Sequence, residues 1–413
     1  MNFIRNYYWI AMLVLLNACK GNDASAGAEL IAPDTSHTDL VKTLNVSSQM
    51  DTATFDYNHL IGDIRYVQLE TNDNCLIGQV SKLIPTDSGF VVADYYFSKS
   101  VFFFSKEGRF IQKIRIDDRK GFPKAIRDIA YNPQLHIVYI YDDKYGAIGC
   151  YTEKGNYLRM VKTGKFRFRR FACLKDSLLV FYKPYLSMGA AINDYEIVIG
   201  DLSQNVFYKA FPEKNEVLDN YDYNINVNRS GGKVFYSRKF SNYVYEINGN
   251  QPSITPFLRF YSSDKTFIND KIKPEISLSE FDLLQSGNTV LYDGSILLAN
   301  DICYVGFLKH SKDVSAFYSL KTGHIVGGQV LSVLGANDSL DIESFTYPVA
   351  SHDSEFISLL YPENIKQSEK LYDSLSSIHQ SPPINRSAVL RDLLKKTDAS
   401  DNPILLLYKL KPF

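Results

Sequence analysis

The chain has 413 residues, of which 45% are hydrophobic and 22% are charged, so it can form a large core and does not have the composition of a disordered protein. Its formal net charge is −1, which excludes a general electrostatic attraction to nucleic acid. Aromatic residues make up 14% of the chain, with 29 Tyr and 26 Phe but one Trp, and this content favours β-strands. We therefore expect an all-β protein that has no nucleic-acid partner.

The first residues have the pattern of a secretory signal. Arg5 is the only charge before Cys19, residues 10–16 are apolar, and a small residue precedes the cysteine. Residues 16–19, Leu-Asn-Ala-Cys, resemble the lipobox of bacterial lipoproteins, in which the cysteine becomes the acylated first residue after cleavage. The sequence therefore predicts a lipoprotein signal peptide at residues 1–18 and lipidation of Cys19.

The residues that follow Cys19 are poor in large apolar side chains and rich in Ala, Ser, Thr, Asp and Asn, which is typical of a flexible spacer. We expect residues 19–57 to be a lipidated tether that holds the folded body, residues 58–413, at a membrane surface. The polar residues directly after the cysteine favour the outer membrane, with the body facing the periplasm or the cell surface.

A repeat of strand, loop, strand, glycine turn and strand runs through the body. The first copy spans residues 90–111 and the second spans residues 137–158, and their turn glycines, Gly108 and Gly155, are 47 residues apart. Less regular copies have their turns near residues 203–205, 248–249 and 322–323. Four-stranded units of roughly 40 to 50 residues are typical of propeller blades.

This spacing predicts an all-β fold, a six-bladed β-propeller. Five units lie between residues 77 and 331, and residues 341–413 supply the sixth. Small helical insertions are expected near residues 276–285 and 363–396. Residues 64–70 form one additional strand, which we expect to pair with the C-terminal strands, because this pairing closes the ring and removes exposed sheet edges.

The first copy resembles an NHL-type repeat. An Ala-Asp pair, two apolar strand positions and a Gly-x-Phe turn stand where that family has them: Val92, Ala93, Asp94, Val101, Phe103, Gly108 and Phe110. Together with the lipobox and the segments at 66–70 and 402–411, the chain resembles the six-bladed β-propeller lipoproteins of Gram-negative gut bacteria over about residues 44–413. The resemblance implies a fold and an envelope location, but no activity.

Two basic loops between blades form the candidate binding site. Loops that connect the outer strand of one blade to the inner strand of the next lie on the propeller face that most often binds ligands. Guanidinium groups form paired hydrogen bonds with carboxylate, sulfate or phosphate, so these loops predict an anionic ligand, such as an acidic polysaccharide. The alternative is a solvated edge on which Arg stems cover Phe rings. The predicted binding residues are Arg119, Lys120 and Lys124 in the first loop and Lys165, Arg167, Arg169 and Arg170 in the second.

Neither a catalytic motif nor a metal-binding motif is present in the sequence. The histidines are scattered and no CxxC pair occurs, so we predict no catalytic residues, no metal and no cofactor. Asp94, Asp142 and Asp143 recur at blade loops. They either bond the local backbone in turns, which we favour, or converge in the central channel, where they would bind calcium.

Four cysteines remain in the body, Cys75, Cys150, Cys173 and Cys303. In an oxidising compartment Cys150 and Cys173, from adjacent blades, are the first candidates for a disulfide, and buried free thiols are the alternative.

The function that the sequence favours is a membrane-tethered binding or assembly platform for an acidic glycan or an envelope protein. One alternative is a metal-assisted hydrolase, lactonase or lyase in the central channel, which requires acidic and histidine side chains around one ion. A structural subunit that docks a membrane partner is a further alternative.

Overall fold

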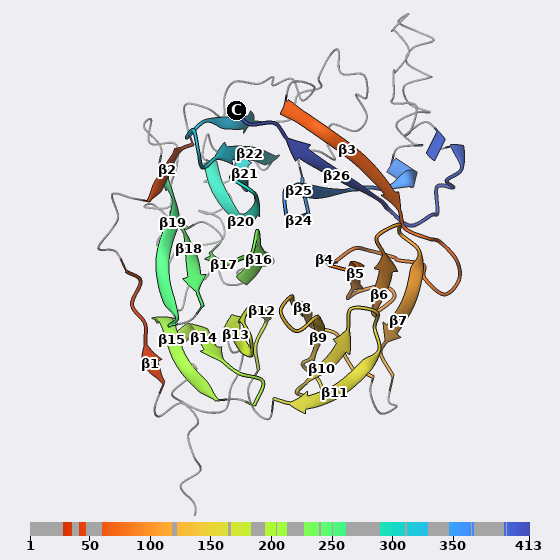
Figure 1. The fold of residues 1–413 in the computed structure, drawn as a ribbon, viewed down its shortest axis with the longest axis horizontal. Coiled ribbons are helices and arrows are strands. Elements are labelled where there is room, and N and C mark those ends of the chain that lie inside the picture. The colour runs from red at the N-terminus through yellow and green to blue at the C-terminus, as the bar shows by residue number, and fades with distance from the viewer. Residues whose placement is uncertain are drawn as a thin grey trace, which may run out of the picture.

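The computed structural model places six sheets of β-strands around a central axis (Figure 1). The strands nearest the axis are β4, β8, β12, β16, β20 and β24, one from each sheet. The molecule is therefore a six-bladed β-propeller, as the repeat predicts. The structure describes residues 28–34, 41–46, 60–117, 122–163, 167–182, 195–203, 205–212, 227–238, 241–249, 251–261, 290–309, 312–328, 347–364, 366, 392–393 and 395–413.

The first three blades follow one another along the chain. Blade 1 consists of β4 (Lys82–Thr86), β5 (Gly89–Asp94), β6 (Ser100–Ser105) and β7 (Phe110–Arg115). Blade 2 consists of β8 (Asp128–Asn132), β9 (Ile137–Asp142), β10 (Ala147–Thr152) and β11 (Tyr157–Lys162). Blade 3 consists of β12 (Arg170–Lys175), β13 (Leu178–Tyr182), β14 (Tyr195–Gly200) and β15 (Val206–Pro212).

The other three blades complete the ring. Blade 4 consists of β16 (Val227–Ser230), β17 (Lys233–Ser237), β18 (Tyr243–Asn248) and β19 (Ser253–Tyr261). Blade 5 consists of β20 (Val290–Ala299), β21 (Ile302–Lys309), β22 (Lys312–Ser319) and β23 (Ile325–Gly328). Blade 6 consists of β24 (Ala350–His352), β25 (Glu355–Leu360), β26 (Ile404–Leu410) and the N-terminal strand β3 (Ile61–Gln68).

The middle strands are buried on both faces, because each blade packs between two others. Every residue of β5 is buried, whereas β11, an outer strand, is mostly exposed. Middle strands therefore need apolar residues at consecutive positions, as in the Phe102-Phe103-Phe104 run of β6. Outer strands carry polar residues on the side that faces solvent.

Aromatic rings fill the space between blades. Between blades 2 and 3, the rings of Tyr141 and Phe168 stack with their centroids 3.7 Å apart. Phe168 also lies 5.3 Å from Phe171 and 4.7 Å from Phe181. The gap between two blades widens away from the axis, so large rings are needed to close it, and this accounts for the high Phe and Tyr content.

The two ends of the propeller are joined in blade 6. β3 pairs antiparallel with β26, which confirms the predicted pairing of the segment at residues 64–70. The buried Asn402 side chain secures this closure: it donates hydrogen bonds to the carbonyl oxygens of Glu70 and Cys75 at 2.7 and 2.8 Å and accepts one from the Ile77 N–H at 2.8 Å. An N-terminal strand thus completes a sheet that C-terminal strands begin.

Two short strands lie within the segment that we expected to be a flexible tether. β1 (Glu29–Leu30) pairs parallel with β15, and β2 (Lys42–Asn45) pairs parallel with β19, so blades 3 and 4 each gain a fifth strand. Leu44 and Val46 are buried in the core between blades 4 and 5. At these residues the segment pairs with the outer strands of blades 3 and 4 and is not a free spacer.

Helical residues are few in the described ranges. Residues 362–364, 366, 392–393 and 395 are helical, in or next to the insertion predicted near 363–396. The insertion predicted near 276–285 lies outside the described residues. Of the helices that the structure describes, none is long and apolar enough to cross a membrane.

The four cysteines of the body are free and buried. Cys150 and Cys173 share one core between blades 2 and 3, but no disulfide joins them. The free-thiol alternative therefore holds. Burial raises the pKa of the Cys173 thiol well above its ordinary value, so the group stays protonated and behaves as a small apolar side chain.

Candidate functional site

A cavity of about 790 Å³ lies on the central axis. Its walls come from the inner strands of the six blades and from the turns that follow them. The polar lining includes Asn228, Ser230, Ser295, Ser351 and the hydroxyl-bearing ring of Tyr131. A volume of this size, lined by a few polar groups, is typical of a small-molecule site.

Among the described residues, three Lys and Arg side chains line the cavity: Lys82 of β4, Arg170 of β12 and Arg229 of β16. The charge of Lys82 is neutralised locally, because its Nζ lies 2.8 Å from Oδ1 of the buried Asp128. Burial lowers the pKa of the Lys82 ammonium group, and the Asp128 charge opposes part of this shift. Lys82 and Asp128 therefore form an internal ion pair between blades 1 and 2.

Arg229 has a different environment. Its Nη1 donates hydrogen bonds to the carbonyl oxygens of Cys173 and Leu174 at 3.0 and 3.1 Å, which ties blade 4 to blade 3. Within the described ranges no carboxylate forms an ion pair with Arg229, and burial lowers the pKa of its guanidinium group. A partly buried cation whose partners are neutral carbonyls favours an anion beside it.

The structure separates the predicted basic residues. Arg170 lines the cavity, and its Nη1 donates to the carbonyl oxygen of Arg127 at 3.3 Å. The backbone N–H of Arg169 donates to the carbonyl oxygen of Tyr182 at 3.1 Å, which aligns the start of β12 with β13. Arg119, Lys120 and Lys165 lie outside the described residues.

Lys124 and Arg167 meet at a different place, the β9–β10 loop of blade 2. The backbone N–H of Lys124 donates to Asp142 at 2.5 Å, and its Nζ lies 5.7 Å from the centre of the Tyr145 ring. The Arg167 guanidinium lies against Gly146, where an added Cβ would be only 2.4 Å from Nη1. Gly146 has a φ of 66°, a left-handed conformation, so the loop favours glycine for its backbone.

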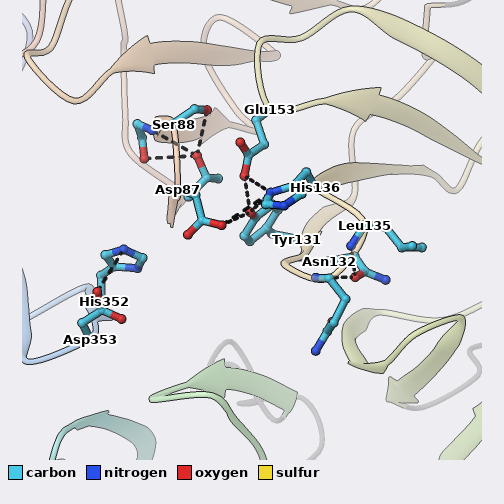
Figure 2. Close-up of polar contacts among 12 residues, drawn as sticks. Asp87, Ser88, Tyr131, Asn132, Leu135, His136, Glu153, His352 and Asp353 are labelled. Carbon is cyan, nitrogen blue, oxygen red and sulfur yellow. Dashed lines mark hydrogen bonds and ion pairs between the residues drawn. The ribbon is translucent and has the colours of Figure 1, made fainter.

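A cluster of polar side chains, drawn in Figure 2, lies where turns of blades 1 and 2 border the cavity, and Asp87 and Tyr131 of this cluster line it; we call this end of the cavity its mouth. Nδ1 of His136 is 3.4 Å from Oδ2 of Asp87 and 3.3 Å from Oε1 of Glu153. The Tyr131 hydroxyl donates to the same oxygen of Glu153. Asp87 and His136 are 55% and 58% exposed, whereas Glu153 is 12% exposed. We call Asp87, Tyr131, His136 and Glu153 the rim cluster.

The backbone holds the rim cluster in place. Asp87 lies in the β4–β5 turn, His136 in the β8–β9 turn and Glu153 in the β10–β11 turn. His136 has a φ of 53°, a left-handed conformation that few side chains adopt. Asn132 fixes this turn, because its Oδ1 accepts the N–H groups of Gln134 and Leu135, both at 3.1 Å.

Hydrogen bonds keep Glu153 ionised despite its burial. Burial acts to raise the pKa of this carboxyl, but hydrogen bonds from Tyr131, His136 and Ser88 outweigh that effect and lower it. His352 and Asp353, which also line the cavity, lie across the mouth from Asp87 (Figure 2).

The aspartates of the blade loops have the structural role that we favoured. Asp94 is buried and accepts hydrogen bonds from the N–H groups of five residues: Gly78, Gln79, Tyr96, Phe97 and Ser98. Asp142 accepts from the N–H groups of Lys124 and Tyr145. Neither they nor Asp143 are among the described residues that line the cavity.

Sequence reasoning missed the rim cluster, because its members are far apart in the chain. The repeat did contain the necessary signal: Asp87 and His136 occupy the first turn of consecutive blades, and a propeller places such turns side by side. The position of Arg229 on the cavity wall was missed as well, because the repeat in blade 4 is one of the least regular.

Most of the sequence matches a known protein family. Residues 41–409 match the family described as a domain of unknown function, DUF4934. The chain belongs to this family. The matched residues begin beside β2 and end within β26, so the DUF4934 region includes all six blades and the added strand on blade 4.

One solved structure supports the fold of this DUF4934 chain. A protein of Bacteroides fragilis that is named as an exported protein aligns with a TM-score of 0.68 and 15% identity, over 90% of this chain and 100% of that one. A DUF4221 member from Bacteroides vulgatus aligns with a TM-score of 0.41 and 9% identity, over 85% and 97% of the two chains. At such identities the first likeness supports the fold alone. The sequence matches no curated protein.

Proposed function

We propose that this DUF4934 protein is an envelope lipoprotein whose propeller binds an acidic glycan in its central cavity. The observation that carries the proposal is the placement of Arg170 and Arg229 on the cavity wall, with Arg229 held by carbonyl oxygens and by no carboxylate of the described residues. Lys82 is excluded from ligand binding, because Asp128 already neutralises it.

The binding energy expected from such a pair is substantial. A hydrogen bond to a charged group contributes about 1.5–3 kcal/mol, and every 1.4 kcal/mol changes affinity about tenfold. The guanidinium fork of Arg229 has donors besides the Nη1 that bonds Cys173 and Leu174, so a ligand carboxylate can bind without breaking the tie between blades 3 and 4.

The lining favours a glycan among anionic ligands. Hydroxyl and amide groups from Asn228, Ser230 and Ser295 match the hydrogen-bonding capacity of sugar hydroxyls. Tyr131 and Tyr304 add aromatic surface to the same cavity. The cavity volume limits the occupant to a few sugar units, so a carboxylate-bearing oligosaccharide is the ligand class that we propose.

The cellular location is proposed from the N-terminal sequence. The lipobox-like residues 16–19 predict acylation of Cys19, and the B. fragilis structure is that of a protein named as exported. The test is metabolic labelling with a clickable fatty acid: the wild type should be labelled in the membrane fraction, and Cys19→Ser should not. Labelling of Cys19→Ser equal to that of the wild type would refute lipidation at this residue.

The binding proposal is tested with the full chain in detergent, titrated with oligogalacturonides and with neutral galactose oligomers at low and moderate salt. We expect the acidic oligomers alone to bind, with an affinity that falls as salt rises. Arg170→Gln and Arg229→Gln should each weaken binding about 10- to 100-fold. Arg115→Gln, on the outer strand β7, is the matched control and should have no effect.

A second pair of variants separates the cavity from the loop of blade 2. If the acidic ligand binds instead at the β9–β10 loop, Lys124→Gln with Arg167→Gln will abolish binding and the cavity variants will not. That result, or equal binding of neutral and acidic oligomers, would overturn the proposal. Melting temperatures of all variants report whether the propeller remains folded.

A further inference from the structure

We propose that Asp87, His136 and Glu153 bind a first-row divalent metal ion, with Zn²⁺ as the best match, at the mouth of the central cavity. This inference is independent of the glycan proposal, because it rests on the rim cluster and not on Arg170 or Arg229.

The distances agree with a metal site. In a tetrahedral zinc site with bonds of 2.0–2.1 Å, neighbouring ligand atoms are about 3.3–3.4 Å apart. Nδ1 of His136 lies 3.3 Å from Oε1 of Glu153 and 3.4 Å from Oδ2 of Asp87. The three ligand atoms all lie within 4.8 Å of one another, so a small rotation of the exposed Asp87 side chain completes the site.

The scaffold preorganises the ligands. Three turns of two adjacent blades supply them, and Asn132 bonds the turn that holds His136 in its left-handed conformation. Strained backbone that surrounding bonds maintain is found most often at functional sites. The Tyr131 hydroxyl faces the three ligand atoms: it donates to Oε1 of Glu153 and lies 3.5 Å from both Oδ2 of Asp87 and Nδ1 of His136, so it moves aside or joins the ligands when an ion binds.

The chemistry of the ligands selects the class of ion. One imidazole nitrogen with two carboxylates suits zinc and neighbouring first-row ions, whereas Ca²⁺ and Mg²⁺ prefer oxygen ligands alone. Asp87 and Tyr131 also line the cavity, so the open side of a bound ion would face the cavity. Three protein ligands and an open position are the arrangement in which zinc accepts an exogenous ligand.

The competing explanation is a metal-free ion-pair triad, in which a protonated His136 bridges the two carboxylates. Calorimetric titration of the chelator-treated full chain with Zn²⁺, Ca²⁺ and Mg²⁺ separates the two. We expect one equivalent of Zn²⁺ to bind far more tightly than the other two ions. His136→Asn, which tolerates the left-handed backbone, and Asp87→Asn should each weaken zinc binding at least about tenfold.

The matched control is His352→Asn, which alters the other His-Asp pair at the same mouth and should leave zinc binding unchanged. A second measurement needs no variant: Zn²⁺ should protect His136 of the wild type from diethylpyrocarbonate, while His352 stays reactive. Absence of saturable zinc binding, equal binding by His136→Asn and the wild type, or unprotected His136 would each overturn the metal site in favour of the ion-pair triad.

Discussion

Lys82→Met should destabilise the propeller by about 3–5 kcal/mol, the usual cost of removing one partner of a buried ion pair. Nζ of Lys82 lies 2.8 Å from Oδ1 of Asp128 and 2.7 Å from the carbonyl oxygen of Ile129. The two side chains are 12% and 0% exposed. In the variant the Asp128 carboxylate keeps the Tyr95 hydroxyl at 3.2 Å and the Phe171 N–H at 3.0 Å, but loses its contacting cation.

A double-mutant cycle isolates the pair. Lys82→Met with Asp128→Asn removes both charges and keeps an acceptor for the Phe171 N–H, so the double variant should be more stable than Lys82→Met alone. Lys233→Met is the matched control: its pair with Glu246 has a similar distance, 2.7 Å, but Lys233 is 40% exposed. Exposed pairs contribute about 0–1 kcal/mol, so this variant should change stability little.

Urea unfolding followed by circular dichroism measures these differences. The same samples should bind acidic oligosaccharide almost as tightly as the wild type wherever they remain folded, because Lys82 is assigned to the fold and not to the ligand. A smaller loss of stability in Lys82→Met than in Lys233→Met, or simple additivity of the Lys82→Met and Asp128→Asn effects, would refute a buried ion pair that stabilises the fold.

Three further predictions concern closure, thiols and alkaline pH. Asn402→Ala removes three hydrogen bonds across the junction of blade 6 and should lower the free energy of unfolding in urea by about 3–5 kcal/mol. Asn205→Ala, at an exposed position, should lower it little. Equal losses in the two variants would contradict the role of Asn402 in closing the ring. An aromatic disulfide reagent should modify none of the four cysteines of the body in the native state and all four after denaturation, and rapid native labelling would contradict their burial. Burial raises the pKa of Tyr139 to about 12, whereas a tyrosine of the unfolded chain ionises near pH 10. Because the phenol therefore ionises first in the unfolded chain, its contribution to the free energy of unfolding is fully present below pH about 10 and should decline towards pH 12. Melting curves should show a smaller decline for Tyr139→Phe than for the wild type.

The blade repeat could be predicted from sequence because its glycines have two physical roles. Gly108 and Gly155 both have a φ of 81°, so the turn itself requires glycine. An added Cβ on Gly108 would lie 2.1 Å from the carbonyl oxygen of Gln68, and one on Gly155 would lie 2.9 Å from the Phe103 ring. Each turn thus packs against the preceding blade, and the spacing of these glycines reports the spacing of blades.

The short strands β1 and β2 could not be predicted in the same way. They lie in a polar segment in which only a few residues, such as Leu44 and Val46, are buried. Parallel pairing with the outer edges of blades 3 and 4 is non-local, so no nearby turn marks it.

The site was predictable only in part. Arg170 was identified from the charge of its loop, but its separation from Arg167 depends on where β12 begins and on the burial of Phe168 between them. The cavity and the rim cluster combine residues from different blades, and a single sequence shows blade spacing without showing which side chains point towards the axis. The neutralisation of Lys82 by Asp128 is likewise visible only in three dimensions.

A crystal structure of the full chain with a bound oligogalacturonide tests the central claim most directly. We predict a sugar carboxylate in the cavity within hydrogen-bonding distance of Arg170 or Arg229, with the Lys82–Asp128 pair intact. A ligand bound at the β9–β10 loop beside Lys124 and Arg167, with no sugar in the cavity, would contradict it.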